Sequence, residues 1–462
     1  MLTPISAGAR RAGAIPLFLV LAVASAGLAL PAAPADAITV QQALAKAYRN
    51  NAQLKAQRAA LDAAADQVQT AKSGWKPHVD LSASAGRTRL DGSFSPLFGD
   101  FSNPANPILP LTLHGSAVGV SVRQPIYEGG RTSAAIDQAQ SMLSAQGAML
   151  QQTEQQVFLQ AAQAYIGVLT DQAVLRLEQN NVNVLKQQLD SAQANLNAGE
   201  ATRTDVAQSQ ARLAGARAQV IQARGNLRED RASFRRIIGV PASNLTPPPP
   251  VSGLPSSLAQ ARQLASQNYP VIAARYAVQA AQYNVDTVKG QFSPSLGLSA
   301  SYLHANDPQF AFSQLNTAEI MLSLSIPIYQ GGALHAQKSH ARHLAEQRRD
   351  QLLDAQRMAV EQVTRAWQAY KTAHAALKSI KAQIQAAQIA FKGVKSEHRV
   401  GERTQLDVLD AQQDLLSARV SLVRAEATMR IAAYALKANT GTLTADAVLG
   451  RTLQQPATAA AP

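Results

Sequence analysis

Two carboxylates just after a glycine turn have a spacing that could serve a function. Asp407 and Asp410 are three residues apart, so both side chains project from one face if this segment is helical. Where several chains surround a narrow bore, these positions give a ring of carboxylates. Such a ring favours cations, and repulsion among its members raises their pKa values. The spacing by itself places both carboxylates on one helical face, and a ring forms only where several chains surround a bore.

The turn before these carboxylates occurs twice in the chain, and both copies also fit a structural role. One copy contains Thr202-x-x-Asp205 and the other contains Thr404-x-x-Asp407. Each resembles a capping box, in which the hydroxyl and the carboxylate bind free amides of the first helical turn. For Asp205 the structural and functional interpretations stay open. The turn residues expected at the tip of the long helices are Gly199, Glu200, Thr202, Gly401, Glu402 and Thr404.

A cluster of histidines could in principle bind a metal. His335, His340 and His343 follow Gly332, and the last two are spaced to share a helical face. Their flanks are basic, and we expect no carboxylate at matching spacing, which favours a solvated helix start. The sequence contains no G-x-S-x-G, P-loop, H-E-x-x-H or dinucleotide motif. We therefore expect neither an enzyme nor a metal or cofactor site.

Composition narrows the classes of protein further. The 462 residues include no cysteine, which excludes disulfides, thiolate metal sites and a lipidated N-terminal cysteine. The net charge of +13 permits an anionic partner. However, lysine and arginine are scattered among alanine and glutamine without a basic block, which is typical of solvated helical surfaces. Nucleic acid is not an expected partner.

The first residues have the order of an export signal. Arg10 and Arg11 precede an apolar run, and Ala35-Asp36-Ala37 offers a cleavage site before Ile38. We predict a signal peptide over residues 1–37 with cleavage between Ala37 and Ile38, which leaves a net charge of +12 because two arginines and one aspartate are removed. No later stretch has the length of an apolar transmembrane helix. The mature chain is therefore soluble outside the cytoplasm or contributes to a β-barrel.

The chain is a duplication. The motif Pro-Ile-Tyr-x-Gly-Gly occurs at 125–130 and again at 327–332, and the two glycine turns are separated by the same offset of 202 residues. Further upstream the offset is 217, so the first copy carries an insertion of 15 residues. The predicted units are repeats at 38–240 and 256–441, a proline-rich linker at 241–255, and a disordered tail at 442–462.

Each repeat combines alternating strands with long helices. Apolar and small polar residues alternate in segments near 78–87, 113–124, 295–304 and 318–327, a pattern that fits either outer-membrane strands or a sheet on a soluble core. Residues 131–198 form a proline-free helix of about 100 Å. The helical stretches 38–76 and 203–238 are each about half as long. They would match the long helix if they stack end to end.

Four strands cannot close a membrane barrel, because spanning barrels need roughly eight or more. Open edges in lipid leave backbone groups unpaired, so several chains must contribute strands. Aromatic residues stand at the junctions between strands and helices, where they form either a membrane-interface girdle or ordinary packing. These residues are Trp75, Phe292, Tyr127 and Tyr329.

The sequence resembles the TolC family of outer-membrane efflux and secretion channels over essentially the whole mature chain. The doubled Pro-Ile-Tyr-x-Gly-Gly and the stretch 400–412, VGERTQLDVLDAQ, carry the resemblance. It implies a mainly α fold with a membrane β-barrel: a coiled-coil α-helical barrel with four β-strands per protomer, and a twelve-strand barrel shared by a homotrimer. The chain is most similar to non-lipidated members of the type I secretion branch.

The resemblance also implies partners and residue roles. A periplasmic adaptor (a membrane fusion protein) would dock at the two turns, and an inner-membrane ABC, RND or MFS transporter would supply drugs or unfolded proteins. By motif position, Asp407 and Asp410 would form a pore constriction, while Arg403 and Asp205 would form links between helices. His398 stands where relatives can have tyrosine, so one link is either missing or pH-sensitive.

These features predict a passive porin-like conduit in the outer membrane of a Gram-negative bacterium, in contact with lipid and extending into the periplasm. The alternative is a soluble periplasmic coiled-coil adaptor or scaffold. That alternative predicts lipoyl-like modules between helices and does not explain two equivalent strand pairs. An exported hydrolase is a third class, for which the sequence contains no motif.

Overall fold

In a computed structural model, the described part of the chain comprises residues 37–90, 111–309 and 312–449. Nearly all of the expected signal peptide and most of the loop between the first two strands lie outside these ranges. Ile38, the expected first residue after cleavage, lies within the fold. Its amide donates a hydrogen bond to the carbonyl oxygen of Asn244 at 2.9 Å.

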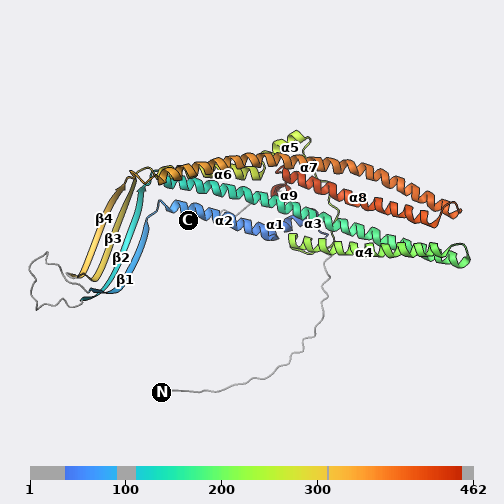
Figure 1. The fold of residues 1–462 in the computed structure, drawn as a ribbon, viewed down its shortest axis with the longest axis horizontal. Coiled ribbons are helices and arrows are strands. Elements are labelled where there is room, and N and C mark those ends of the chain that lie inside the picture. Colours follow the sequence, from blue (N-terminus) through green and yellow to red (C-terminus); the bar gives the residue numbers. More distant parts are fainter. Residues whose placement is uncertain (1–36, 91–110, 310–311, 450–462) are drawn as a thin grey trace, which may run out of the picture.

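A small sheet and a long helical bundle occupy opposite ends of an elongated molecule (Figure 1). The strands are β1 (His78–Leu90), β2 (Leu111–Tyr127), β3 (Ser295–Gln309) and β4 (Phe312–Ser325). The helices are α1 (Val40–Asn50), α2 (Ala52–Ser73), α3 (Arg131–Ala198), α4 (Arg203–Ile238), α5 (Leu258–Ala265), α6 (Tyr269–Gly290), α7 (Ala333–Arg399), α8 (Gln405–Asn439) and α9 (Ala445–Leu449). The long helices α3 and α7 run from the sheet to the far tip, where they turn back into α4 and α8.

The sheet is antiparallel throughout, and its order β1-β2-β3-β4 follows the chain. Alternate residues of a strand point to opposite faces, so the register assigns every side chain to one of two faces. One face, here called the apolar face, carries exposed side chains such as Leu81 (74% exposed) and Ile320 (80% exposed). The other face, called the polar face, carries Asp80, Ser121, Ser301 and Glu319. The members of the apolar face include Val79, Leu81, Val118, Val120, Val122, Leu298, Ala300, Tyr302, Ile320, Leu322 and Leu324.

The apolar band crosses the strands obliquely. We call residues that pair in register across the four strands a row, and we count only the rows on the apolar face. Val79 is the first apolar residue of β1, and its row continues through β2 and β3 to Ile320. Along β4, however, the band starts two rows nearer the helices, at Leu324. From β1 to β4 the band thus shifts by two rows, which is about 13 Å along the strands. The distance across the sheet from β1 to β4 is three strand spacings, or about 14 Å. The band therefore runs at about 40° to the perpendicular of the strands.

The helix expected over residues 38–76 is in fact two helices. Asn51 has an extended backbone (ψ 126°) that ends α1, and its side-chain oxygen accepts hydrogen bonds from the amides of Gln53 and Leu54 to begin α2. Its side-chain amide also donates to the carbonyl oxygen of Ile237 near the end of α4. Asparagine is a strong N-cap residue, and here that preference overrides helix continuity. As expected, α2 and α4 follow one another along α3 (Figure 1).

The second repeat makes the equivalent contact. Asn268 begins α6, and its side-chain amide donates to the carbonyl oxygen of Asn439 at the end of α8. Gly239 and Gly441, which follow α4 and α8, both have positive φ (84° and 75°). A Cβ on Gly239 would lie 2.9 Å from the Cβ of Asn50, so this approach needs glycine. The duplication thus preserves a contact between the start of one helix and the end of another.

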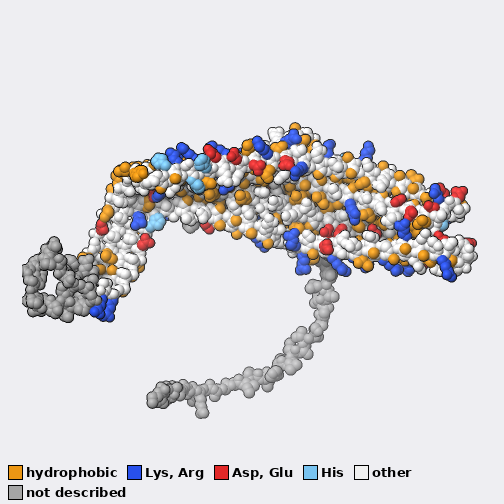
Figure 2. Space-filling model, viewed as in Figure 1, with side chains coloured by type: hydrophobic (Ala, Val, Ile, Leu, Met, Phe, Trp, Pro, Cys, Tyr) orange, Lys and Arg blue, Asp and Glu red, His pale blue; other side chains and the backbone are white. Residues whose placement is uncertain are grey.

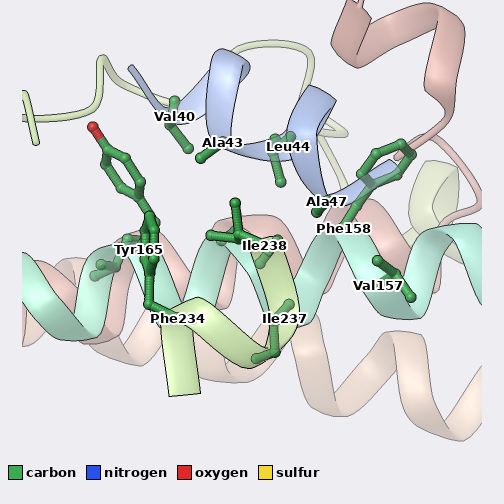
Figure 3. Close-up of a cluster of buried hydrophobic side chains, with 14 of the residues drawn as sticks. Val40, Ala43, Leu44, Ala47, Val157, Phe158, Tyr165, Phe234, Ile237 and Ile238 are labelled. Carbon is green, nitrogen blue, oxygen red and sulfur yellow. The ribbon is translucent and has the colours of Figure 1, made fainter. Parts of the chain in front are cut away.

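The largest cluster of buried apolar side chains lies in the middle of the bundle (Figure 3). Phe158, Tyr165, Phe234 and Ile238 are completely buried where α1, α3 and the end of α4 meet. The Tyr165 hydroxyl lies 2.7 Å from the carbonyl oxygen of Ile38, so the segment before α1 is held against α3. We refer to this cluster as the central core.

In the tail expected to be disordered from residue 442, residues 442–449 are ordered. Leu443 is 1% exposed and belongs to the central core, and α9 packs on α1. Ala445 and Val448 pack against the same core, so contacts with other helices hold a short segment that lacks helical periodicity. Residues 450–462 lie outside the described ranges. In the described ranges, no helix is long and apolar enough to cross a membrane.

Candidate gate at the helical tip

The turn between α3 and α4 is built by a glycine and a capping threonine. Gly199 ends α3 in the left-handed conformation (φ 81°), and the amide of Glu200 donates to the carbonyl oxygen of Asn195. This bond satisfies one of the free carbonyls at the helix end. Thr202 and Asp205 then form a capping box at the start of α4.

The turn between α7 and α8 repeats this geometry and adds two side-chain contacts. Gly401 (φ 83°), Thr404 and Asp407 take the places of Gly199, Thr202 and Asp205. In addition, Arg403 Nε donates to Glu397 Oε2 at 3.0 Å. The His398 Nδ1–H donates to the carbonyl oxygen of Arg403 at 2.9 Å. The second turn is therefore more strongly cross-linked than the first.

Capping lowers the pKa of both turn aspartates. Asp407 Oδ2 accepts hydrogen bonds from the amide and the hydroxyl of Thr404, at 2.9 and 2.8 Å, and these bonds stabilise the charged carboxylate. They hold its pKa below the usual aspartate value, with smaller contributions from Arg403 and His398. Thr202 lowers the pKa of Asp205 in the same way, and His398 contributes there too. Hence both carboxylates stay charged at neutral pH.

One leucine attaches α8 to the first repeat. Leu409 is 2% exposed and packs with Leu185 of α3 and with Leu213 and Ala216 of α4. It lies two residues after Asp407, so the cap and the apolar anchor occupy the same first turns of α8. We call Leu409 and its three partners the tip cluster.

Polar contacts flank the tip cluster on both sides. Asp410 accepts from Arg212 of α4 at 2.5 Å, and the side chains of this pair are 54% and 41% exposed. The buried Gln412 donates to Asn181 Oδ1 at 2.9 Å and accepts from Gln188 Nε2 at 2.5 Å, both on α3. These bonds join α8 to the first repeat across more than 190 residues of sequence.

A groove of about 500 Å³ separates the two turns. Glu200 and Asp205 line it from the first repeat, and Lys395, His398 and Arg399 line it from the second. The two walls therefore carry opposite charge. His398 lies close enough to both turn aspartates to lower the pKa of each, which makes it the residue that faces both turns.

The predicted gate residues gather at this tip, but their partners differ from those expected. Asp410 is bound to Arg212 rather than presented as a free carboxylate beside Asp407. Arg403 binds Glu397, and Asp205 binds Thr202, so within one chain both contacts stay inside a single turn. Links from these residues to neighbouring chains remain a prediction.

The sequence interpretation did not identify Arg212, Gln412, Asn181, Gln188 and Glu397 as part of the tip. The partners lie on different helices, and neither the offset of 202 nor helical spacing relates Arg212 to Asp410. The sequence signal for a packed face here is the heptad-like spacing of Val182, Leu185 and Leu189 on α3.

The other candidate sites lie at the opposite end of the helices. Trp75, Tyr127 and Tyr329 are exposed at the strand–helix junctions, and Phe292 packs edge-on against His335. The expectation that the histidine cluster lacks a matching carboxylate was wrong. Glu346 lies one turn after His343 and approaches its Nδ1 at 3.3 Å. No three metal-ligating side chains come together in the described ranges.

Comparison with protein families gives one match that spans the chain. The family described as "Outer membrane efflux protein" matches residues 40–240 and 261–442. These two segments nearly coincide with the two repeats. The match includes both turns, the tip cluster and the polar contacts that flank it.

Individual relatives agree with this match. The chain is 33% identical to the outer membrane efflux protein BepC of Brucella suis, over 92% of this chain and 90% of that protein. It is 27% identical to the alkaline protease secretion protein AprF of Pseudomonas aeruginosa, over 76% and 73%. Among solved structures, the CmeC outer membrane channel of Campylobacter jejuni superposes with a TM-score of 0.76 at 17% identity, over 88% of this chain and 86% of CmeC.

Proposed function

The chain belongs to the outer membrane efflux protein family, and from this membership we propose that copies of it form the conduit of a tripartite exporter. Its place is the outer membrane of a Gram-negative bacterium, and it extends into the periplasm. The family consists of efflux and secretion channels, so the alternative of a soluble adaptor is set aside. Lack of catalytic activity is part of the proposal, as are the adaptor and the inner-membrane transporter.

The sheet supports assembly from several chains. Its outer strands, β1 and β4, each pair on one side only in the described chain. Unpaired strand edges cost several kcal/mol per backbone group in lipid, so β4 of one copy pairs with β1 of the next. Three copies give the twelve strands that the family resemblance implies. The apolar face then contacts lipid and the polar face lines the lumen.

The tip supports a gating role. Leu409, the Asp410–Arg212 pair and the Gln412 amide all attach α8 to the first repeat beside the two turns. This attachment is the single observation that carries the gate assignment. Opening moves α7 and α8 away from α3 and α4, and it requires these contacts to break. The charged groove between the turns offers an adaptor a surface from which to drive that motion.

Planar bilayers distinguish a carboxylate ring from a contact that holds the tip closed. If Asp407 and Asp410 line the bore, Asp407→Asn with Asp410→Asn weakens the block of single-channel current by divalent cations. If Arg212 and Gln412 hold α8, Arg212→Gln and Gln412→Leu increase conductance and leave the divalent block intact.

Gln413→Leu is the matched control, because Gln413 is exposed and its side-chain amide hydrogen-bonds Ser417 on its own helix. Unchanged block in the double aspartate variant removes these residues from the ring. Unchanged conductance in both Arg212→Gln and Gln412→Leu overturns the gate. Absence of any conductance from the wild-type protein overturns the channel function itself.

A further inference from the structure

The duplicated chain contains the same helix pair twice. α2 packs along α3 in the first repeat, and α6 packs along α7 in the second. A third contact joins the repeats, because α3 also packs along α6. Figure 1 shows the resulting order, with α2 and α7 at the two edges of this helical layer and α3 and α6 between them. The two edge helices are therefore the repeat equivalents of the two helices that meet in the middle.

The contact between α3 and α6 is antiparallel, and two observations fix its register. A Cβ on Gly290, the last residue of α6, would lie 2.9 Å from the amide nitrogen of Arg131, the first residue of α3. At the other end, burial and the nearby Glu154 carboxylate raise the pKa of Tyr269, the first residue of α6. Both helices rise by about 1.5 Å per residue, so positions between these ends can be assigned to the same height along the two axes.

The middle of this contact is filled by small, buried side chains. Ser141, Ala145 and Ala148 of α3 are each at most 8% exposed. On α6, Ala273 and Ala280 are 5% and 3% exposed. In the register above, Ser141 and Ala280 lie at the same height. The distance between two packed helices depends on the side chains at their contact, so small residues here allow α3 and α6 to approach closely.

The equivalent positions on the edge helices are exposed. The offset of 202 residues relates the three α3 positions to His343, Gln347 and Asp350 of α7, all of which are exposed. The offset of 217 relates the two α6 positions to Ala56 and Ala63 of α2, which are exposed as well. A contact that is buried within the chain thus has an uncovered counterpart at each edge.

The uncovered positions of α7 face away from its partner within the chain. Ala341 and Ala345 of α7 pack with Val285 of α6. His343 and Gln347 each follow one of these alanines by two residues, which is about 200° around a helix. They are therefore directed to the side opposite α6, where the layer ends.

We propose that α7 of one copy packs antiparallel along α2 of the next copy, in the register that α3 and α6 have within the chain. The strands lead to this arrangement, because α7 follows β4 and α2 precedes β1, just as α3 follows β2 and α6 precedes β3. His343 then lies at the height of Ala63 in the next copy. The inference rests on the proposed function, because it uses the pairing of β4 with β1 of a second copy.

The side-chain sizes at these positions are complementary. Within the chain, the large Tyr276 of α6 lies at the height of the small Ala145 of α3. Between copies, the small Ala59 of α2 lies at the height of the larger Gln347 of α7. Each contact thus combines one large and one small residue at this height, which permits close packing in both.

Polar groups also match between the two edges. Figure 2 shows histidine, basic and acidic side chains along the edge of the molecule that α7 forms. In the proposed register, His340 lies near the height of Asp66, and Asp350 lies within one residue of the height of Lys55. An imidazole N–H and an ammonium group are both good donors to a carboxylate. The equivalent positions within the chain are uncharged: Gln138, Tyr283, Ala148 and Ile272.

Disulfide cross-linking in outer-membrane preparations tests the interface, because the chain has no cysteine of its own. Ala63→Cys with His343→Cys should join neighbouring copies on oxidation, so that covalent dimers and trimers become the main products on a non-reducing gel. Ser141→Cys with Ala280→Cys is the matched pair within one chain. It should form a disulfide, detected by peptide mass mapping, without producing a dimer.

A second pair of cysteines tests which face of α7 is used. Leu344 is 37% exposed and follows His343, but it lies about 100° further around the helix. Ala63→Cys with Leu344→Cys should therefore lose most of the covalent dimer under the same oxidation, because the two Cβ atoms do not point toward each other.

A size exchange tests the register. Ala59→Tyr places a ring against Gln347 and should lower the fraction of trimer on unheated gels by about tenfold, because overpacking destabilises a contact. Ala59→Tyr with Gln347→Ala should restore most of the trimer, since this pair copies Tyr276 and Ala145. Gln69→Tyr is the control, because Gln69 and its α6 equivalent Asp286 are both exposed, and it should leave the trimer unchanged.

The outcomes separate this interface from the channel function. Absence of dimers from Ala63→Cys with His343→Cys, when the pair within one chain does form, overturns the interface. Equal dimer yields with His343→Cys and Leu344→Cys overturn the assigned face, and failure of Gln347→Ala to rescue Ala59→Tyr overturns the register. Wild-type conductance in planar bilayers reports on the channel independently. A conducting protein without the cross-link rejects only the interface, whereas cross-linked trimers from a protein that does not conduct reject only the channel.

Discussion

Phe158, Tyr165 and Phe234 are completely buried in the middle of the bundle, whereas Leu409 is the largest fully buried side chain of the tip cluster. The central core joins several helices with aromatic rings, among them Tyr165 and Phe234 with centroids 6.3 Å apart. The tip joins its helices through one leucine, one exposed ion pair and a few amides. A tip held by so few contacts is expected to open locally at a lower cost in free energy than the central core.

The carboxylates of the two regions have pKa values shifted in opposite directions. Burial raises the pKa of Glu154 in the middle of the bundle, although Arg58 and the Tyr48 hydroxyl oppose that shift. Threonine caps lower the pKa of Asp407 and Asp205 at the tip. Acidification therefore favours the folded state through the middle of the bundle and weakens it through the caps of the tip.

The largest effect is expected from Phe234→Ala in the central core. Truncation of a fully buried aromatic residue costs about 3–5 kcal/mol in the free energy of unfolding. Near-ultraviolet circular dichroism during heating should show the loss as a lower unfolding temperature of the whole chain. Ile221→Ala is the control on the same helix, because Ile221 is 70% exposed and its truncation should cost less than about 0.5 kcal/mol. Equal losses in the two variants would contradict a stability centred on the core.

A smaller and local effect is expected from Leu409→Ala at the tip. The substitution removes about 2–3 kcal/mol of packing, but mainly from the contact between α8 and the first repeat. Hydrogen exchange should accelerate over the first turns of α8 while the unfolding temperature changes little. Leu406→Ala, one turn earlier and 38% exposed, is the control. If Leu409→Ala lowers the unfolding temperature as much as Phe234→Ala, the tip and the core are a single cooperative unit.

The two turns can be compared directly, because the loss of either N-cap should cost about 1 kcal/mol of helix stability. Thr202→Ala and Thr404→Ala remove equivalent N-cap hydrogen bonds. We expect more fraying at α4 than at α8, because the second turn keeps the contacts of Arg403 with Glu397 and His398. Hydrogen exchange of the first helical turns measures the difference. Greater exchange at α8 would show that the additional contacts do not stabilise the turn.

The smallest effect is a change in pH dependence. A raised pKa means that Glu154 stabilises the fold fully below its ordinary value of about 4.3, and that this contribution is lost as pH rises through the raised pKa. Glu154→Gln should therefore flatten the fall in unfolding temperature over that range. Glu200→Gln, at the exposed first turn, is the control. If the difference in unfolding temperature between wild type and Glu154→Gln stays constant with pH, the pKa of Glu154 is not raised.

Asp407 is expected to show the opposite sign. Its pKa is lowered, so its contribution is present above the ordinary aspartate value of about 3.9 and is lost as pH falls through the lowered value. Exchange at the start of α8 should thus increase only in strong acid. Asp407→Asn should abolish this increase. Persistence of the increase in that variant assigns it to another group.

Some features of the fold could be predicted because they depend on neighbouring residues. The helix α3 spans Arg131–Ala198, the range expected from the absence of proline and the glycine that follows. Strand alternation and the capping boxes are equally local. The break at Asn51 was missed, because the side-chain amide that fixes it binds Ile237, 186 residues away. The order of residues 442–449 was missed for a similar reason, since Leu443 is buried by residues from other helices.

The duplication, the two faces of the strands and the two capped turns could all be predicted from the residues, since each follows from their spacing along one element. The side chains that meet across elements became clear only from the folded chain. The fold pairs Asp410 with Arg212 and Gln412 with Asn181, and it aligns the slanted apolar band across the four strands. The reason is physical: a contact between distant segments depends on how helices pack and strands register, and that geometry is set by the whole chain.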